Sequence, residues 1–203
     1  MSNPLKKIWS WLGHDETQYD LGGKEFSNRD LSNRNLQGAF FSNCTFENAD
    51  LSGADLTGAY FTESNMKGAN LTNANLSGAN LQYANLEGAI LINANLTNAK
   101  LGSAILNNAS LEMANFTGAS LAGAKVQNAT LWKANFSGAN LRFTNFYRSS
   151  MTQVNLSGAV MWDAYIREAD LTGANVVGLV IDPLLLESAI GISAEDYYNT
   201  RCS

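Results

Sequence analysis

Residues 69–89 read ANLTNANLSGANLQYANLEGA, in which a leucine follows Ala-Asn at every fifth residue. On an α-helix, five residues advance by about 500°, so successive leucines would lie ~140° apart and form no apolar stripe. On a β-strand, the odd spacing would place successive leucines on opposite faces. The pattern fits a chain that turns a corner every five residues and always returns the same position to the inside, which is a solenoid.

The five-residue register runs without a break from Leu21 to Ile181. Its 33 large apolar positions hold 19 Leu, 7 Phe, 3 Met, 2 Val and 2 Ile. Two residues before each of these, from Ala39 to Ala174, 23 of 28 positions are Ala, and the exceptions are small or compact: Cys44, Ser64, Thr144, Ser149 and Val154. One large and one small inward residue per unit predict a narrow coil whose axis is filled by the large side chains.

The unit A-(N/D)-L-x-x, present here as ANLTN, ANLSG, ADLSG, ADLTG and ANFTG, resembles the repeat of the pentapeptide-repeat family. The resemblance covers residues 21–181 and implies an all-β fold, a right-handed quadrilateral parallel β-helix with four pentapeptides per coil. About eight coils, spaced by ~4.8 Å, would make a rod roughly 40 Å long. The Asn- and Leu-rich composition is similar to that of cyanobacterial members. Local irregularity is expected where Lys24, Arg29 and Arg34 replace Ala, and in the stretch 142–156, RFTNFYRSSMTQVNL.

Two features support a coil of twenty residues. Three pairs of core phenylalanines are twenty residues apart, and their rings are expected to stack: Phe26/Phe46, Phe41/Phe61 and Phe116/Phe136. Along one face, from Asn35 to Gly178, Asn precedes the core residue in seven of eight coils and Gly ends the unit in seven of eight. This face predicts a hydrogen-bonded ladder of Asn side chains beside turns with positive φ.

The repeat predicts one elongated domain, residues 21–181, between a lead-in at 1–20 and a tail at 182–203. NPLKKIWSWLG, residues 3–13, predicts a short helix that covers the first coil, with a membrane-surface helix or a partner anchor as alternatives. Asp182 and Pro183 begin DPLLLESAIG, which predicts a helix that caps the last coil or joins two rods. The protein is therefore expected to be a monomer or a dimer through a rod end.

The sequence offers no catalytic, cofactor or metal constellation. The single histidine, His14, has no second histidine with which to build a triad or a histidine-based metal site. Asp50 and Asp55 stand at a repeat position that Asn fills elsewhere, so they are not expected to act as a general-acid pair. We expect that the protein is not an enzyme and that it binds no cofactor and no small-molecule substrate.

The two cysteines indicate a reducing compartment. Cys44 occupies a small inward position and Cys202 lies in the tail, so they are not expected to pair, and a cytoplasmic location is favoured. No stretch approaches the ~20 apolar residues of a transmembrane helix. The apolar run in residues 3–13 is too short for a signal peptide and no small-residue cleavage site follows it.

Charge separates the function classes. Some members of the family resemble a charged duplex and occupy DNA gyrase, which requires a strongly anionic surface. Residues 21–181 hold 11 acidic and 10 basic side chains, a net charge of −1, and residues 64–160 carry a net charge of +4. DNA carries a charge every ~1.7 Å, so this rod is a poor copy of DNA.

Because the protein has a pI near 4.8, direct binding of nucleic acid is not expected either. We favour a non-enzymatic scaffold or adaptor that binds a protein partner, with a DNA-mimicking, gyrase-protecting protein as the alternative.

One cluster of outward residues departs from the small, polar pattern. It contains seven aromatic or basic side chains: Arg142, Phe143, Tyr147, Arg148, Trp162, Tyr165 and Arg167. Three pairs are twenty residues apart: Arg142/Trp162, Tyr147/Arg167 and Arg148/Glu168. These pairs predict two cation–π contacts and one ion pair if the cluster only stabilises the surface. They predict a partner site if the cluster is functional, because Trp, Tyr and Arg most often anchor interfaces.

Overall fold

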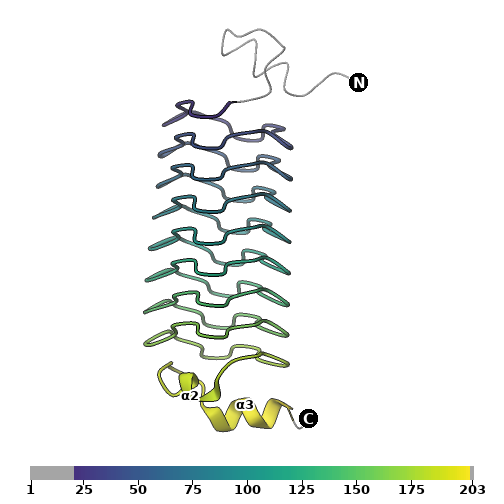
Figure 1. Cartoon of the computed structure of the whole chain (residues 1–203), viewed down its shortest axis with the longest axis vertical. Helices are drawn as coiled ribbons and strands as arrows, with labels where there is room; N and C mark the ends of the chain where they lie inside the picture. Colours follow the sequence, from purple (N-terminus) through teal and green to yellow (C-terminus); the bar gives the residue numbers. More distant parts are fainter. Residues whose placement is uncertain (1–20, 202–203) are drawn as a thin grey trace.

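A computed structural model describes residues 21–201 as a rod of stacked coils followed by two short helices (Figure 1). Parallel bridges join residues twenty apart along the rod, as in Asn70 with Ile90, which confirms four pentapeptides per coil. Residues 21–180 therefore form eight coils. The helix expected at residues 3–13, together with His14 and Cys202, lies outside the described residues.

Each side of the coil contributes one bridge residue per turn rather than an extended strand. The reason is geometric: the chain turns again after five residues, and two of these form the corner. The all-β expectation is thus met by parallel backbone pairing between coils, without any strand of ordinary length in the described rod.

The unit around Leu71 shows how the backbone is satisfied. Its N–H donates to the carbonyl oxygen of Ile90 in the next coil at 2.7 Å, and the Asn73 N–H donates to that of Ile92 at 3.0 Å. The turn is closed by the Ala74 N–H, which donates to the carbonyl oxygen of Leu71 at 3.0 Å. Hydrogen bonds between coils therefore run parallel to the rod and hold each coil to its neighbours.

The preference for Asn or Asp before the core residue has a local cause. From residue 27 to residue 177, the N–H of the first corner residue has no backbone acceptor, and at many corners the side chain two residues earlier accepts it. The Thr72 N–H, for example, donates to Oδ1 of Asn70 at 3.1 Å. This Asx-type bond explains why Asn and Asp recur at a position that faces solvent.

The second residue of each corner has a positive φ, as type II turns require. Gly and Asn fill most of these positions because they adopt this conformation at low cost. Bulky residues also occur there, including Tyr83 with φ 60° and Phe143 with φ 58°.

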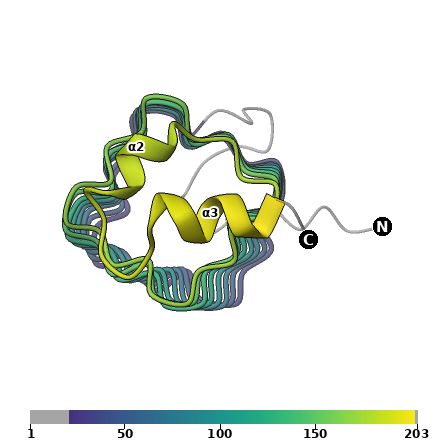
Figure 2. The same cartoon turned by 90° about the horizontal axis from the view of Figure 1, so that it is seen from below.

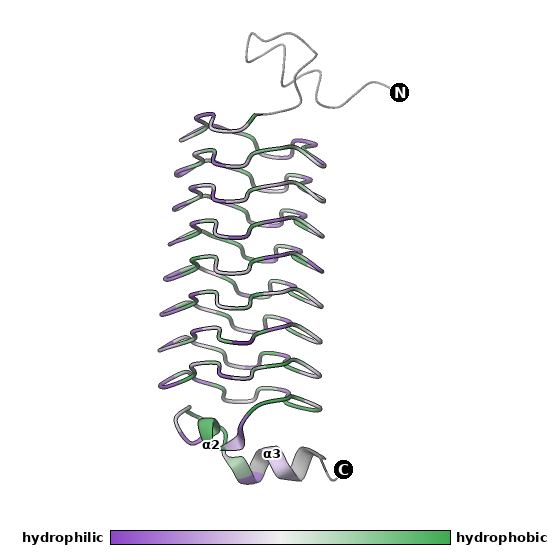
Figure 3. Cartoon of the chain, viewed as in Figure 1, coloured by the Kyte–Doolittle hydropathy of each residue, from purple (hydrophilic) through white to green (hydrophobic). Residues whose placement is uncertain are grey.

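The predicted core is buried. None of the 33 core side chains is more than 5% exposed. The small inward positions are buried as well, except Ala174, which is partly buried in the last coil. All three predicted phenylalanine stacks form, with ring centroids 4.8, 5.2 and 4.6 Å apart. Hydrophobic and hydrophilic segments recur in every coil of the rod (Figure 3).

The four sides are named by the core residue of their first coil: face A by Leu21, face B by Phe26, face C by Leu31 and face D by Leu36. Viewed along the rod, the coils superimpose in a four-sided outline (Figure 2). Face D carries the predicted asparagine ladder, in which Nδ2 of Asn155 donates to Oδ1 of Asn135 at 3.0 Å.

The local irregularity expected at Lys24, Arg29, Arg34 and residues 142–156 is absent. Bridges and turns keep their period through both stretches. The three basic residues stand in the first described coil and are exposed, so their long side chains do not enter the crowded axis. In residues 142–156, compact side chains occupy the small inward positions, which preserves the coil.

The tail forms helix α2, Pro183–Leu186, and helix α3, Ala194–Arg201, which lies across the end of the rod (Figures 1 and 2). Asp182 begins α2 by accepting the Leu184 N–H at 3.0 Å. Tyr197 of α3 is 1% exposed, and its hydroxyl donates to the carbonyl oxygen of Leu179 at 2.8 Å. Among the described residues, no helix is both long and apolar enough to span a membrane.

Candidate functional site

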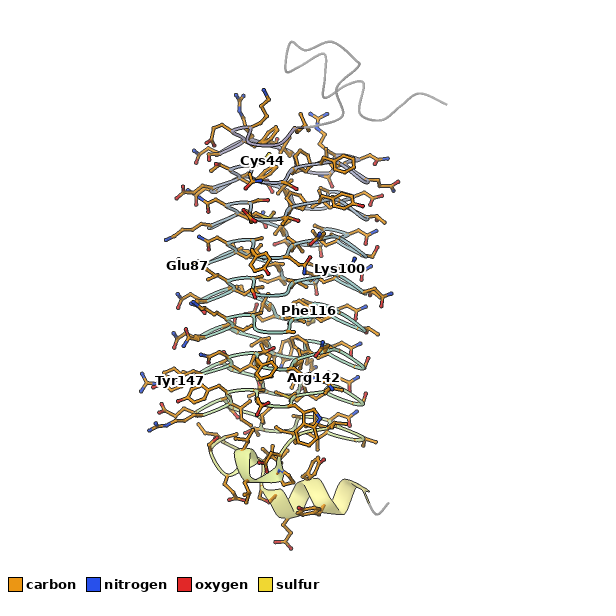
Figure 4. All side chains as sticks on the ribbon, in the orientation of Figure 1. Cys44, Glu87, Lys100, Phe116, Arg142 and Tyr147 are labelled. Carbon is orange, nitrogen blue, oxygen red and sulfur yellow. The ribbon has the colours of Figure 1, made fainter. Side chains whose placement is uncertain are left out.

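The cluster predicted from the sequence is one continuous surface on the rod. Its residues lie on face B and on the two corners that border it, in the last two coils; Figure 4 labels Arg142 and Tyr147. Adjacent members are linked through the backbone, since the Phe143 N–H donates to the carbonyl oxygen of Trp162 at 3.0 Å. We call this surface the C-terminal patch: Arg142, Phe143, Tyr147, Arg148, Trp162, Tyr165 and Arg167.

Glu168 organises one side of the C-terminal patch, at the corner between faces B and C. Its carboxylate accepts a hydrogen bond from Nε of Arg148 at 2.7 Å, which confirms the predicted ion pair. Nε of Arg167 lies 3.6 Å from the same carboxylate, and the hydroxyl of Tyr147 lies 3.4 Å from it. The hydrogen bond from Arg148 lowers the pKa of Glu168 below its ordinary value. Two arginines thus share one carboxylate.

The two predicted cation–π pairs are wrong. In the described part of the chain, neither Arg142 with Trp162 nor Tyr147 with Arg167 makes such a contact. The Tyr147 ring instead meets the guanidinium of Arg148 at 4.9 Å. Tyr147 thus meets the other residue of its own corner, and Arg167 lies near Glu168, the other residue of its corner.

The other side of the C-terminal patch, at the corner between faces A and B, keeps its apolar area accessible. Phe143 is 62% exposed and Trp162 is 45% exposed, while Tyr165 on face B between the corners is 46% exposed. The Tyr165 and Tyr147 rings lie 5.9 Å apart. The patch therefore joins a corner held by ion pairs to a corner of exposed aromatic rings.

Sequence reasoning missed that exposed apolar side chains are not confined to the last coils. Further examples on the rod are Phe40, Tyr60, Tyr83, Ile90, Met113 and Trp132. Phe40 and Tyr60 stack on face A with centroids 4.8 Å apart, and twenty-residue steps would have revealed this pair. Nζ of Lys133 lies 4.5 Å from the Trp132 ring centroid. The C-terminal patch is distinguished by combining several rings with three arginines.

The potential metal ligands of residues 21–201 are dispersed. No group of three or more His, Cys, Asp or Glu side chains in this range could hold a metal ion. At the C-terminal patch, Arg148 and Arg167 meet the carboxylate of Glu168 at the surface.

The repeat matches a known protein family. The family of pentapeptide repeats matches in eight copies, over residues 25–62, 54–93, 94–132, 114–153 and 134–173. The chain belongs to the pentapeptide-repeat family. The right-handed sense of the coil, which the resemblance implies, stays a prediction.

Solved structures share the repeat. HetL, a pentapeptide repeat protein involved in heterocyst differentiation regulation from the cyanobacterium Nostoc sp. strain PCC 7120, is 27% identical, with a TM-score of 0.60 over 94% of both chains. A pentapeptide repeat protein of the Arabidopsis thaliana thylakoid lumen is 33% identical over 47% of this chain and 66% of its own, with a TM-score of 0.46. QnrB1, a plasmid-mediated fluoroquinolone resistance protein, is 20% identical over 87% of this chain and 99% of its own, with a TM-score of 0.47. No curated protein matches the chain significantly.

Proposed function

We propose that this protein is a non-enzymatic scaffold or adaptor that binds a protein partner through the C-terminal patch, in the cytoplasm. The observation that carries the proposal is the exposure of Phe143, Trp162 and Tyr165 beside arginines that are already positioned by Glu168. Aromatic rings and arginines with restricted motion anchor interfaces at low entropic cost. The resemblance to HetL along the whole chain adds support, because that protein is involved in regulation.

The alternative role, a DNA mimic that protects gyrase, has weaker support. A mimic needs anionic side chains along its length, whereas residues 21–181 have a net charge of −1. We expect the purified protein neither to inhibit gyrase supercoiling nor to restore it in the presence of a quinolone. Activity in either assay at stoichiometric protein would promote this alternative over the adaptor.

The adaptor proposal is tested by capture from cells of the source organism with wild-type protein and with the double variant Trp162→Ala/Tyr165→Ala. A partner that depends on the C-terminal patch should be lost with the variant. The matched control is Trp132→Ala/Tyr60→Ala, which removes two rings of similar exposure, 42% each, from other parts of the rod.

Thermal unfolding separates the two interpretations of the patch. If the aromatic residues only stabilise the surface, the double variant melts at a lower temperature and retains every captured protein. If they anchor a partner, the melting temperature changes little and the partner is lost. Retention of every interaction by Trp162→Ala/Tyr165→Ala would remove the C-terminal patch from consideration.

A further inference from the structure

A second surface lies in the middle of the rod, on the corner between faces A and B. Four consecutive corner positions there carry almost no side chain. We call them the saddle: Gly102, Ser103, Ala122 and Gly123. Gly102 and Ser103 form this corner in one coil, and Ala122 and Gly123 form it in the next, where the Ser103 N–H donates to the carbonyl oxygen of Ala122 at 3.0 Å. The Tyr83 N–H donates to the carbonyl oxygen of Gly102 at 3.0 Å, which puts Tyr83 directly beside one end.

An exposed aromatic ring stands at each end of the saddle. Tyr83 is 60% exposed and Phe143 is 62% exposed. Both occupy the corner position with positive φ, where a bulky residue is uncommon and Gly or Asn would be less strained. Three coils separate the two residues, so at ~4.8 Å per coil their backbones are about 14 Å apart.

Cations flank the saddle on both sides. Lys100 lies on face A, in register with Ser120, and Lys125 lies on face B, in register with Ile105. Arg142 stands at the end next to Phe143, and Figure 4 shows it on the same side of the rod as Lys100. All three side chains are exposed, and none forms an ion pair with any residue in the described part of the chain. The stretch from residue 64 to residue 160, which contains the saddle, has a net charge of +4 in a protein with a net charge of −5.

We propose that the saddle binds an acidic, extended segment of a partner protein, with two or three carboxylates between two apolar residues. The proposal rests on the adaptor function and names the chemistry of a partner, at a surface that overlaps the C-terminal patch only at Arg142 and Phe143. An extended chain rises ~3.3 Å per residue, so apolar residues four positions apart span the ~14 Å between the rings. The carboxylates between them lie between Lys100 and Lys125.

A nucleic acid fits this surface less well. Its charges continue beyond the aromatic rings, where the same corner carries Glu63 one coil before Tyr83 and Asp163 one coil after Phe143. A polyanion would meet these carboxylates and the net negative protein, whereas a short acidic segment ends before them. The saddle has a low profile because Gly102 and Gly123 have no side chains of their own. The polar side chains of Gln82 and Ser103 lie over them, with Nε2 of Gln82 3.6 Å and Oγ of Ser103 3.5 Å from the positions that a Cβ atom would take.

The test uses fluorescence anisotropy with the full chain and labelled peptides. The probe is SGLDEDLGS, which places leucines four residues apart around three carboxylates. Its controls are SGDLELDGS, with the same composition and a shorter leucine spacing, and the charge-reversed SGLKRKLGS. We expect the probe to bind at least tenfold more tightly than either control, with affinity falling as salt rises. A single-stranded oligonucleotide of equal charge is measured alongside.

Two kinds of variant locate the site. Lys100→Glu/Lys125→Glu should weaken binding of the probe at least tenfold by reversing the flanking charges. Ala122→Trp should do the same by filling the saddle, and the corner tolerates this residue because Trp132 and Trp162 occupy the same position of their units. The matched control, Thr72→Trp, adds an equal side chain on the corner between faces C and D and should leave affinity unchanged.

The outcomes separate this proposal from the adaptor role of the C-terminal patch. Trp162→Ala/Tyr165→Ala should bind the probe as the wild type does, whatever its effect on capture from cells. Equal binding of all three peptides, or an unchanged affinity in folded Lys100→Glu/Lys125→Glu and Ala122→Trp, overturns the saddle proposal. Tighter binding of the oligonucleotide than of the probe, lost in the same variants, overturns it in favour of nucleic acid.

Discussion

The small inward position shows how strictly a single residue is constrained. Four of its five exceptions to Ala, which are Cys44, Ser64, Thr144 and Ser149, make a specific hydrogen bond in the interior. The Thr144 hydroxyl donates to the carbonyl oxygen of Leu121 in the preceding coil at 2.9 Å. That oxygen also accepts the Ala124 N–H of its own turn at 2.9 Å, so both lone pairs are used. Ser64 and Ser149 make the equivalent bonds to Phe41 and Val126. A polar group is therefore accepted when it reaches this one carbonyl.

Replacing Ala79 with Leu should be strongly destabilising. Ala79 is fully buried beside the core residues, and three additional carbon atoms have no space at close-packed density. We expect the free energy of unfolding to fall by about 1–3 kcal/mol or more, measured by urea denaturation. The control is Ser120→Leu at an outward position of face A, where Val160 stands two coils later, and it should change stability by less than ~0.5 kcal/mol. If Ala79→Leu leaves the free energy of unfolding unchanged, the small inward position is not crowded.

Face D is the element with the most continuous side-chain bonding. Nδ2 of Asn135 donates to Oγ1 of Thr117 at 3.0 Å, and its Oδ1 accepts from Nδ2 of Asn155 at 3.0 Å. The same Oδ1 accepts the Ser137 N–H at 3.1 Å. Each asparagine thus satisfies its own turn and ties together two coils. The ladder also uses these polar groups internally, which argues against face D as the principal binding surface.

The variants Asn135→Ala and Asn140→Ala separate two roles of asparagine, the hydrogen bond to its own turn and the ladder bonds to neighbouring coils. Asn140 on face A accepts the Arg142 N–H at 3.3 Å and has no ladder partner in the described rod. We expect Asn135→Ala to lower the free energy of unfolding by about 1–3 kcal/mol, because it removes several bonds worth ~0.5–1.5 kcal/mol each. Asn140→Ala should lower the free energy of unfolding by about half as much or less, because it removes only the bond to the turn. Equal losses in chemical denaturation would show that the ladder contributes nothing beyond the turn.

The Glu168 corner should give a pH-dependent contribution to stability. The hydrogen bond from Arg148 lowers the pKa of Glu168 in the folded protein below its ordinary value of 4.5. The contribution is therefore complete above pH 4.5 and is lost as pH falls through the lowered pKa, where Glu168 becomes neutral. Glu168→Gln should reduce the melting temperature at pH 7, and the difference from wild type should disappear at the acidic end of the titration. A difference independent of pH would show that packing, and not charge, holds this corner.

At the scale of the whole rod, the sequence was sufficient for the core and for the ladders. Core residues such as Leu71 recur every fifth position and stacked pairs such as Phe116 and Phe136 every twentieth, so a list of positions determines which core side chains meet. The pattern did not predict that each side of the coil pairs with the next coil through a single bridge residue and not through an extended strand. It also predicted irregularity around residues 142–156 that the small inward side chains in fact prevent.

The candidate surfaces were only partly predictable. The ion pair of Arg148 with Glu168 followed from the twenty-residue step, but the contact of Arg148 with Tyr147 did not. Corner side chains can meet either their neighbour in the turn or the residue one coil away, and rotamers decide between these. The saddle was missed because its feature is the near absence of side chains between Tyr83 and Phe143, which a search for distinctive residues passes over.

The structure contains two periods, five for the core and twenty for the ladders, and deletions can tell which one governs folding. Deleting residues 61–80 removes one coil and leaves every ladder on its own face. Deleting residues 61–70 also keeps the five-residue register, since Tyr60 is then followed by Leu71 at a core position, but it turns the rest of the rod by two faces. Because the core is filled by equivalent residues on all four faces, we expect both proteins to fold with cooperative melting.

The melting temperatures of the two deletion proteins can be ranked, because a stack of coils is stabilised by the contacts between adjacent coils. The twenty-residue deletion should melt below the wild type, and its scattering profile should show a rod shorter by about 4.8 Å. The ten-residue deletion loses half as much core, but Asp55 is then followed on face D by Asn85, and this ladder next meets Ile105 and Lys125 in place of Asn. Its melting temperature should still lie between those of the other two proteins, because the ladder from Asn75 onward moves intact to face B and only one junction is mismatched. If the ten-residue deletion is unfolded while the twenty-residue deletion is folded, side-chain ladders and not the apolar core set the fold.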